Sequence, residues 1–244
     1  MLIGLGVLLT PAAYHRIVEQ GRISGRFHQL LTVVLAIALL PFAIGLSAAM
    51  YVAGERVGSH RLAAGAGVSS LLAALGSWYG LEWGTRLKKK NASRTAASSK
   101  HAAQAAAQEM GQEINPKLTD KIKEVLIEAR MVLPGAQALL GFQFSIVVME
   151  GFLKIPVSSR YIQFASLSAI ALSTIFLIMP AAYHRLAYEG EDSEEFYLLS
   201  GRLLLIAMFF LRLGVSGDFM VVCRKVTVLD REHRSRAAPA DVLL

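Results

Sequence analysis

Cysteine is nearly absent from this chain of 244 residues, and charged residues make up only 18% of it. The single cysteine, Cys223, excludes an internal disulfide and a cysteine-based metal cage. Apart from His15 and His184, the histidines complete no metal-ligand spacing, so the leading expectation is no bound metal and no cofactor. GxSxG, HExxH and CxxC motifs are missing too, as is a glycine-rich phosphate loop. We therefore expect a protein without enzymatic activity.

What the chain does have is apolar residues, 54% of the total, gathered into long runs. Five runs approach or exceed the length of about 20 residues that spans a bilayer. They lie near residues 27–53, 62–83, 135–152, 161–183 and 198–222. A sixth run, residues 1–14, covers roughly 21 Å of a hydrocarbon core of about 30 Å. The sequence predicts an all-α integral membrane protein with about six transmembrane helices, whose main partner is the lipid bilayer.

The net charge of +7 raises the question of nucleic-acid binding. The basic residues lie mainly in loops and tails beside apolar runs, and no basic patch interleaved with aromatic residues is present. The positive-inside rule and contact with anionic lipid explain such a pattern. We therefore expect no nucleic-acid partner.

Two polar segments divide the chain further. Residues 85–117 form a linker rich in Ala, Ser and Lys, and residues 227–244 form a basic tail. After the linker, Leu118, Ile122 and Val125 recur at helical spacing, which predicts an amphipathic helix that ends at Pro134. Two interpretations remain open: this helix lies along the membrane surface, or it packs on protein.

The six residues "PAAYHR" occur twice, at 11–16 and at 180–185, which is 169 positions apart. An ungapped match extends from residues 11–57 onto residues 180–226 and includes Gly45 with Gly214. Such a match indicates an internal duplication. We expect two membrane repeats, residues 1–84 and 118–226, of which the first is truncated. Because the first repeat begins halfway through its motif helix, we also expect that the full arrangement has one more helix upstream.

The number of crossings predicts the orientation. Four predicted transmembrane segments separate the two motifs, so both motifs lie on one side of the membrane and the repeats are parallel. The lysines at 88–90 place that side in the cytoplasm, together with the whole linker 85–117. The second copy of the motif, where nothing would be cleaved, argues against a signal peptide at the first copy.

One stretch of the second half of the chain resembles a known protein family. The stretch "EARMVLPGAQALLGFQF" at residues 128–144, followed by an apolar helix ending in "PAAYHR", resembles a bacterial family of small multi-pass membrane proteins of unknown function. The resemblance covers about residues 118–226, and the second half of its pattern covers residues 11–57. It implies a helical fold in the bacterial inner membrane and implies no activity.

The motif itself predicts a helix end at the membrane interface. Proline bends the helix, tyrosine belongs to an aromatic belt, and arginine reaches the lipid phosphates. An alternative is that the two histidines form a proton relay or bind a metal or haem. The interface residues are Pro11, Tyr14, His15, Arg16, Pro180, Tyr183, His184 and Arg185.

Arg212 is the least expected residue, because it lies near the middle of the apolar run between Arg202 and Arg224. An arginine at that depth costs about 2.5–3.5 kcal/mol on insertion scales, and it normally faces protein or water. Asp218 lies on another face of the same helix, so Glu150 on a neighbouring segment is the predicted partner. The other interpretation is a shifted helix in which Arg212 extends to the membrane surface.

Small residues also predict helix packing. Gly76, Gly80 and Gly84 have the spacing of four that lets two membrane helices approach closely. The leading hypothesis is a multi-pass inner-membrane protein with a packing or partner-binding role, either as a homo-oligomer or with a membrane partner. The second is a small-solute or ion transporter with a polar path lined by Arg212, Asp218 and Glu150. The third is a haem or metal protein that uses His15 and His184.

Overall fold

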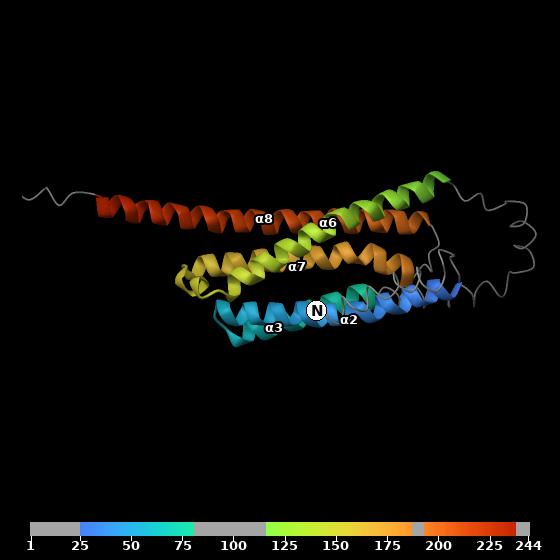
Figure 1. Ribbon diagram of the computed structural model, residues 1–244, viewed down its shortest axis with the longest axis horizontal. Helices are drawn as coiled ribbons and strands as arrows, with labels where there is room; N and C mark the ends of the chain where they lie inside the picture. Colours follow the sequence, from blue (N-terminus) through green and yellow to red (C-terminus); the bar gives the residue numbers. More distant parts are fainter. Residues whose placement is uncertain (1–24, 81–115, 187–192, 238–244) are drawn as a thin grey trace, which may run out of the picture.

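A computed structural model describes residues 25–80, 116–186 and 193–237 of the chain. These residues form helices and short connections, with no strand among them. Figure 1 shows the long helices lying side by side with their axes roughly parallel. In chain order they are α2 (Gly25–Val57), α3 (His60–Leu75) with a π-helical extension η1 (Gly76–Gly80), α6 (Pro116–Val148), the 3-10 helix η2 (Glu150–Lys154), α7 (Val157–Leu186) and α8 (Glu194–Ala237).

The helices α2 and α3 form a tight antiparallel hairpin. The turn between them uses Gly58 at φ +145°, a conformation that side chains with a Cβ rarely adopt. Beside the turn, a Cβ on Gly54 would meet the backbone of Ala63, so the two helix backbones approach closely there. Further along, the Ser47 hydroxyl donates a hydrogen bond to the carbonyl oxygen of Gly67 at 2.8 Å. Small residues and this bond hold the hairpin together.

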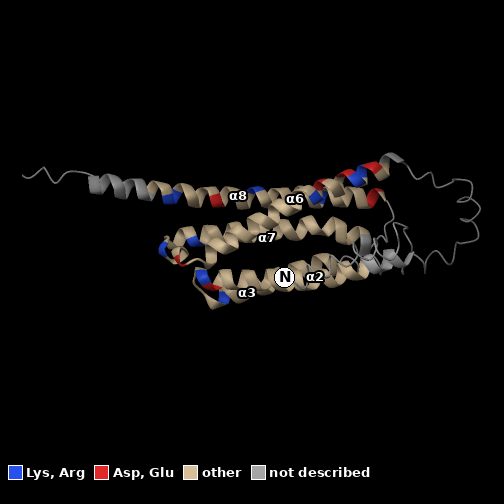
Figure 2. Cartoon of the chain, viewed as in Figure 1, with Lys and Arg blue, Asp and Glu red and all other residues tan. Residues whose placement is uncertain are grey.

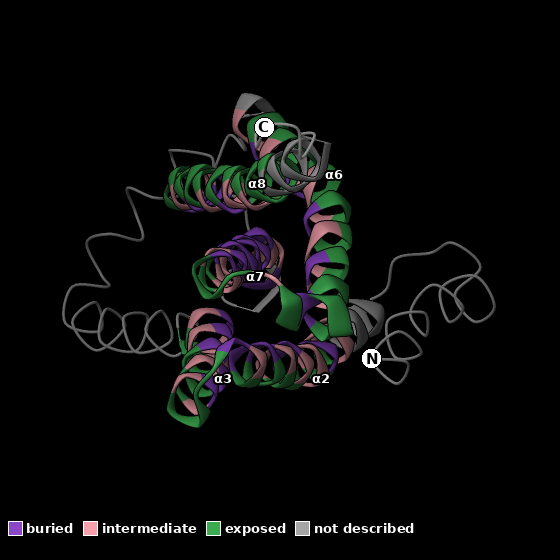
Figure 3. Cartoon of the chain, turned by 90° about the vertical axis from the view of Figure 1, so that its left-hand side faces the viewer, coloured by how far each residue is buried: buried purple, intermediate pink, exposed green. Residues whose placement is uncertain are grey.

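The helix α7 is the centre of the bundle. In its most apolar stretch 61% of the residues are buried, against 28% or less in each of the other four long helices. Figure 3 shows α7 between α8 and the α2–α3 pair, with α6 along one side. The main hydrophobic core joins α7 residues such as Leu167 and Ile175 to α2 residues such as Leu46 and Met50. Burial of apolar surface around α7 therefore organises the described part of the chain.

The helix α6 corrects one expectation from the sequence. Pro134 was expected to end an amphipathic helix, but α6 runs without interruption from Pro116 to Val148. Proline removes one backbone hydrogen bond, and a long apolar helix packed on neighbours tolerates that loss. The amphipathic part packs on protein, because Ile122 is buried against Tyr183 and Phe196. Of the two interpretations left open, the structure favours packing on protein.

The helix α8 also differs from expectation. It has 44 residues, which corresponds to about 66 Å, and it continues to Ala237, past the predicted start of the tail at residue 227. Its contact with α7 depends on two glycines. A Cβ on Gly214 would meet the Ile170 side chain, and a Cβ on Gly217 would meet the Ser166 hydroxyl. These glycines let α7 and α8 lie closer than larger residues would allow.

In α2, α3 and α7, charged residues gather toward the helix ends and leave long uncharged stretches, whereas α8 also carries charged residues along its length, as Figure 2 shows. Five helices are long and apolar enough to cross a membrane. Their apolar stretches match the five long runs expected from the sequence. The predicted short first segment, residues 1–14, and most of the linker 85–117 lie outside the described residues.

Candidate functional site

The bundle buries one polar cluster that joins three helices. The Asp218 carboxylate on α8 accepts a hydrogen bond from the Gln163 amide on α7 at 3.0 Å and another from the Gln143 amide on α6. Both glutamines are buried, with exposed fractions of 2% and 4% for Gln143 and Gln163. The side-chain oxygen of Gln143 has no hydrogen-bond partner within the described structure. A carboxylate that accepts hydrogen bonds from two amides therefore links α6, α7 and α8.

The structure does not bring together the three residues of the predicted polar path. Asp218 points inward to the two glutamines, whereas Arg212 is exposed on the other side of α8. Glu150 is exposed in η2, at the end of α6, and forms no ion pair with Arg212. The helical spacing of Arg212 and Asp218 predicted different faces, and this is confirmed. The described residues show no ion pair between Arg212 and Glu150, so this partnership stays a prediction without support from the structure.

Sequence reasoning missed the two glutamines that hold Asp218. A signal for them was available, because Gln143 and Gln163 are long amide side chains within the largely apolar runs of α6 and α7. Buried amides in such a setting normally have a hydrogen-bond partner, so an aspartate on a third apolar run was their natural partner.

The second "PAAYHR" motif lies inside α7 and is mostly buried. Pro180 is within the helix, and the Tyr183 side chain is buried against Phe196 with ring centroids 6.4 Å apart. The His184 ring lies 4.9 Å from the Phe196 ring. Tyr183 is therefore part of the packing between α7 and α8. The first motif, with Pro11, Tyr14, His15 and Arg16, and the Arg185 side chain lie outside the described residues.

The described residues give no support to metal or haem binding by the two histidines. His184 packs on an aromatic ring, and His15 is outside the part of the chain that is described. Across residues 25–80, 116–186 and 193–237, no three His, Cys, Asp or Glu side chains gather as metal ligands.

The glycines of close packing are not those that the spacing predicted. A Cβ on Gly76 or Gly80 would meet nothing within 4 Å, and Gly84 lies outside the described residues. Close packing instead occurs at Gly54 and Gly67 in the α2–α3 hairpin, and at Gly214 and Gly217 between α7 and α8. Spacing alone does not say which side of a helix meets a neighbour.

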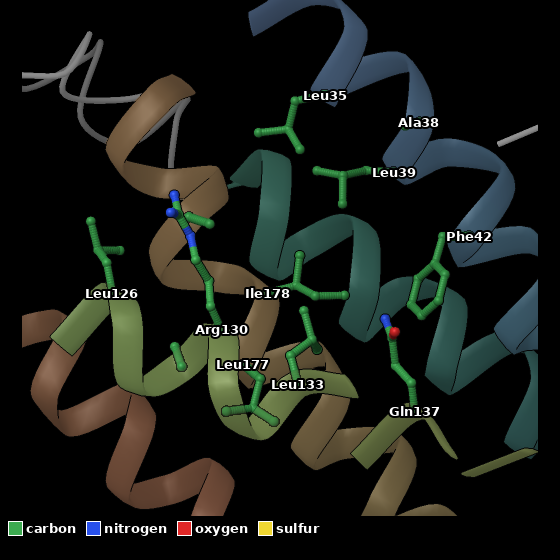
Figure 4. A pocket seen from close by; sticks show the side chains of 12 residues that line it. Leu35, Ala38, Leu39, Phe42, Leu126, Arg130, Leu133, Gln137, Leu177 and Ile178 are labelled. Atoms are coloured by element: carbon green, nitrogen blue, oxygen red, sulfur yellow. The ribbon is translucent and has the colours of Figure 1, made fainter. Parts of the chain in front are cut away.

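One cavity of about 230 Å³ lies between α2, α6 and α7. Figure 4 shows its walls, in which apolar side chains such as Leu39, Phe42 and Leu177 surround the space. Two polar residues, Arg130 and Gln137, reach it from α6. A space with so few polar groups offers apolar contact and little chemistry for a reaction.

These observations define a class: a helical bundle in which five helices are long and apolar enough to cross a membrane, and in which several buried polar side chains bond one helix to another. Within this class, residues 113–238, more than half of the chain, match the model of the family of unknown function DUF6328. The chain belongs to that family. No curated protein and no solved structure matches it.

Proposed function

We propose that this protein is a multi-pass protein of the bacterial inner membrane that acts by binding a membrane partner and has no enzymatic activity. Several buried polar side chains support this, because they bond one helix to another. The Trp78 indole donates to the Ile175 carbonyl oxygen, and the Ser173 hydroxyl donates to the Ala207 carbonyl oxygen. The cavity between α2, α6 and α7 is lined mainly by apolar side chains.

The observation that carries the partner-binding role is the exposed outer side of the bundle. Arg212 is exposed in the middle of α8, with the large apolar side chains of Leu205 and Phe219 exposed near it. In a bilayer, an arginine directed at lipid is costly, whereas an arginine directed at a partner protein is not. The proposed orientation, with the linker 85–117 and both "PAAYHR" motifs in the cytoplasm, rests on the positive-inside rule.

Photo-crosslinking in intact membranes tests the partner-binding role. A photoreactive amino acid is placed at Leu205 on α8, at Leu72 on α3 or at Met131 on α6, all of which are exposed. We expect a protein adduct of one mass at Leu205 and lipid adducts at the other two positions. Lipid adducts alone at all three positions would contradict the proposal. A variant with the photoreactive residue at the buried Ile170 measures background.

A second function, transport of an ion or small solute, is favoured by one observation. Asp218, Gln143 and Gln163 place a carboxylate and two amides between three helices that could span the bilayer. The polar path of this second function consists of these three residues without Arg212 and Glu150, because both of those side chains are exposed. If this function holds, purified protein in proteoliposomes would show a flux of the tested ion or solute. The substitution Asp218→Asn would abolish that flux while the protein stays folded. Equal flux in empty liposomes and in both protein samples would exclude this function.

A further inference from the structure

We propose that the outer face of α8, formed by Phe209, Arg212, Ser216 and Phe219, binds a transmembrane helix that carries a carboxylate level with Arg212. All four residues are exposed. The inference rests on the proposed function, since it assumes that the bundle lies in a bilayer and has a partner there. It adds the position of the contact and the chemistry of that partner.

The depth of Arg212 follows from the packing of α8 on α7. Gly214 packs against Ile170, which lies at the middle of the apolar span Val157–His184. Arg212 is two residues from Gly214, about 3 Å along the helix axis. It therefore lies near the centre of the bilayer, with roughly 15 Å of hydrocarbon toward either surface.

Arg212 has no counter-charge at this depth among the described residues. The nearest carboxylate along α8, that of Asp218, points into the bundle and accepts two hydrogen bonds from glutamines. No ion pair in the described ranges involves Arg212. A guanidinium facing hydrocarbon is unfavourable, so a partner that supplies a carboxylate at this depth would relieve that cost.

The internal match of the sequence points to a helix as the occupant. At the offset of 169 residues, Arg212 corresponds to Ala43 of α2, Ser216 to Ser47 and Phe219 to Met50. On α2 most of this face is covered, and Leu40, which corresponds to Phe209, is its exposed edge. Ala43 and Met50 are 0% and 3% exposed, and the Ser47 hydroxyl donates to the Gly67 carbonyl oxygen of α3. The face that α3 covers on α2 is open on α8.

The same comparison indicates how the partner would pack. Against α2, the helix α3 places a glycine opposite the serine, where a larger residue would meet the Ser47 backbone. By analogy, a partner helix on α8 would have a small residue opposite Ser216. Its carboxylate would lie opposite Arg212, about one helical turn away, because the two α8 residues are four positions apart.

A second copy of this chain is a poor occupant on grounds of charge. A two-fold pairing of α8 with α8 about the membrane normal would place Arg212 against Arg212, and like charges at an interface are unfavourable. A second copy that offered its α3 would bring no carboxylate, because His60–Leu75 contains no Asp or Glu. A helix of a different protein therefore fits this face better than α8 or α3 of a second copy.

The test uses a synthetic peptide as the probe. The peptide is a Leu/Ala transmembrane helix with one central Glu and a Gly four residues from it, and the matched control peptide has Gln in place of Glu. The full chain carries a fluorescent donor on a cysteine introduced at the exposed Ser158, with Cys223 changed to Ser, and the peptides carry an acceptor. We expect energy transfer in liposomes to show at least about tenfold tighter binding of the Glu peptide.

Variants assign this preference to Arg212. Arg212→Leu is expected to bind both peptides equally weakly, Arg212→Lys to keep the preference, and Arg212→Glu to prefer a peptide with a central Lys. Arg202→Leu removes another exposed arginine of α8 near the helix start, and it should keep the wild-type preference. Circular dichroism and thermal unfolding check that every variant is folded, as expected for changes on an outer face.

Two results would overturn the inference. One is equal binding of the Glu and Gln peptides to wild type, and the other is an unchanged Glu preference in Arg212→Leu. Energy transfer between labelled copies of this chain that Arg212→Leu abolishes would instead identify a second copy as the occupant, and it would overturn the assignment to a different protein. A protein adduct at Leu205 in the crosslinking experiment would keep the proposed function intact in each of these cases.

Discussion

The indole nitrogen of Trp78 donates a hydrogen bond to the carbonyl oxygen of Ile175 at 3.1 Å, across 97 residues of sequence. Trp78 is 1% exposed and lies against Phe42, with ring centroids 6.0 Å apart. This residue fastens the end of the α2–α3 hairpin to the central helix α7. Its burial combines a large apolar contact area with a satisfied polar group, which is the usual condition for a buried tryptophan.

Replacing Trp78 with a smaller residue should lower the stability of the fold. We expect Trp78→Ala to lower the free energy of unfolding by about 3–5 kcal/mol, because it leaves a large cavity in the core. Trp78→Phe keeps most of the ring and loses the hydrogen bond, so the expected loss is smaller, about 1–2 kcal/mol. Unfolding in detergent followed by circular dichroism measures both. Leu72→Ala, at an exposed position of α3, is the control with little expected change.

The contact between α7 and α8 can be tested with one glycine substitution and a control substitution at the corresponding glycine of α2. Gly214→Ala adds a methyl group where the Ile170 side chain and the Ser166 carbonyl oxygen lie, and overpacking of this kind costs about 1–3 kcal/mol. Gly45→Ala makes the same change at the corresponding position of α2, where a Cβ meets nothing within 4 Å. We expect a lower unfolding temperature for Gly214→Ala only. Equal effects of the two changes would contradict the close packing at Gly214.

The polar cluster should show energetic coupling between Gln163 and Asp218. Gln163→Leu leaves the Asp218 carboxylate with one donor fewer, which we expect to cost about 1–3 kcal/mol. A double-mutant cycle with Asp218→Leu should give a coupling energy of about 0.5–1.5 kcal/mol. Gln137→Leu, at an exposed amide of α6, should change stability little. A coupling energy near zero would show that the hydrogen bond contributes nothing to stability.

The proposed topology predicts which positions a membrane-impermeant thiol reagent can label from the same side of the membrane. The turn between α2 and α3 and the connection between α6 and α7 lie at the same end of the bundle, while α8 begins at the other end (Figure 1). In a Cys223→Ser background, Ser59→Cys and Ser158→Cys should be labelled from one side of the membrane and Glu195→Cys from the other. Labelling of Ser59→Cys and Ser158→Cys from opposite sides would refute the arrangement of the spans.

The sequence by itself determined the class of this molecule. Apolar runs long enough to cross a bilayer predict helices, because a backbone surrounded by hydrocarbon must satisfy its own hydrogen bonds. Five of the expected runs overlap five long apolar helices. Cys223 as the single cysteine, and the separate faces of Arg212 and Asp218, were likewise readable from composition and helical spacing.

Tertiary structure alone decided which side of each helix faces a neighbour. In a helix that is apolar on every side, hydrophobic periodicity carries little information about direction, so Gly76 and Gly80 were indistinguishable from Gly214 and Gly217. The continuation of α6 past Pro134 likewise depends on contacts with other helices. The same physical reason explains Arg212 and Asp218. Local sequence placed them on different faces, but only the position of α7 turned Asp218 toward the two glutamines and left Arg212 on the outside.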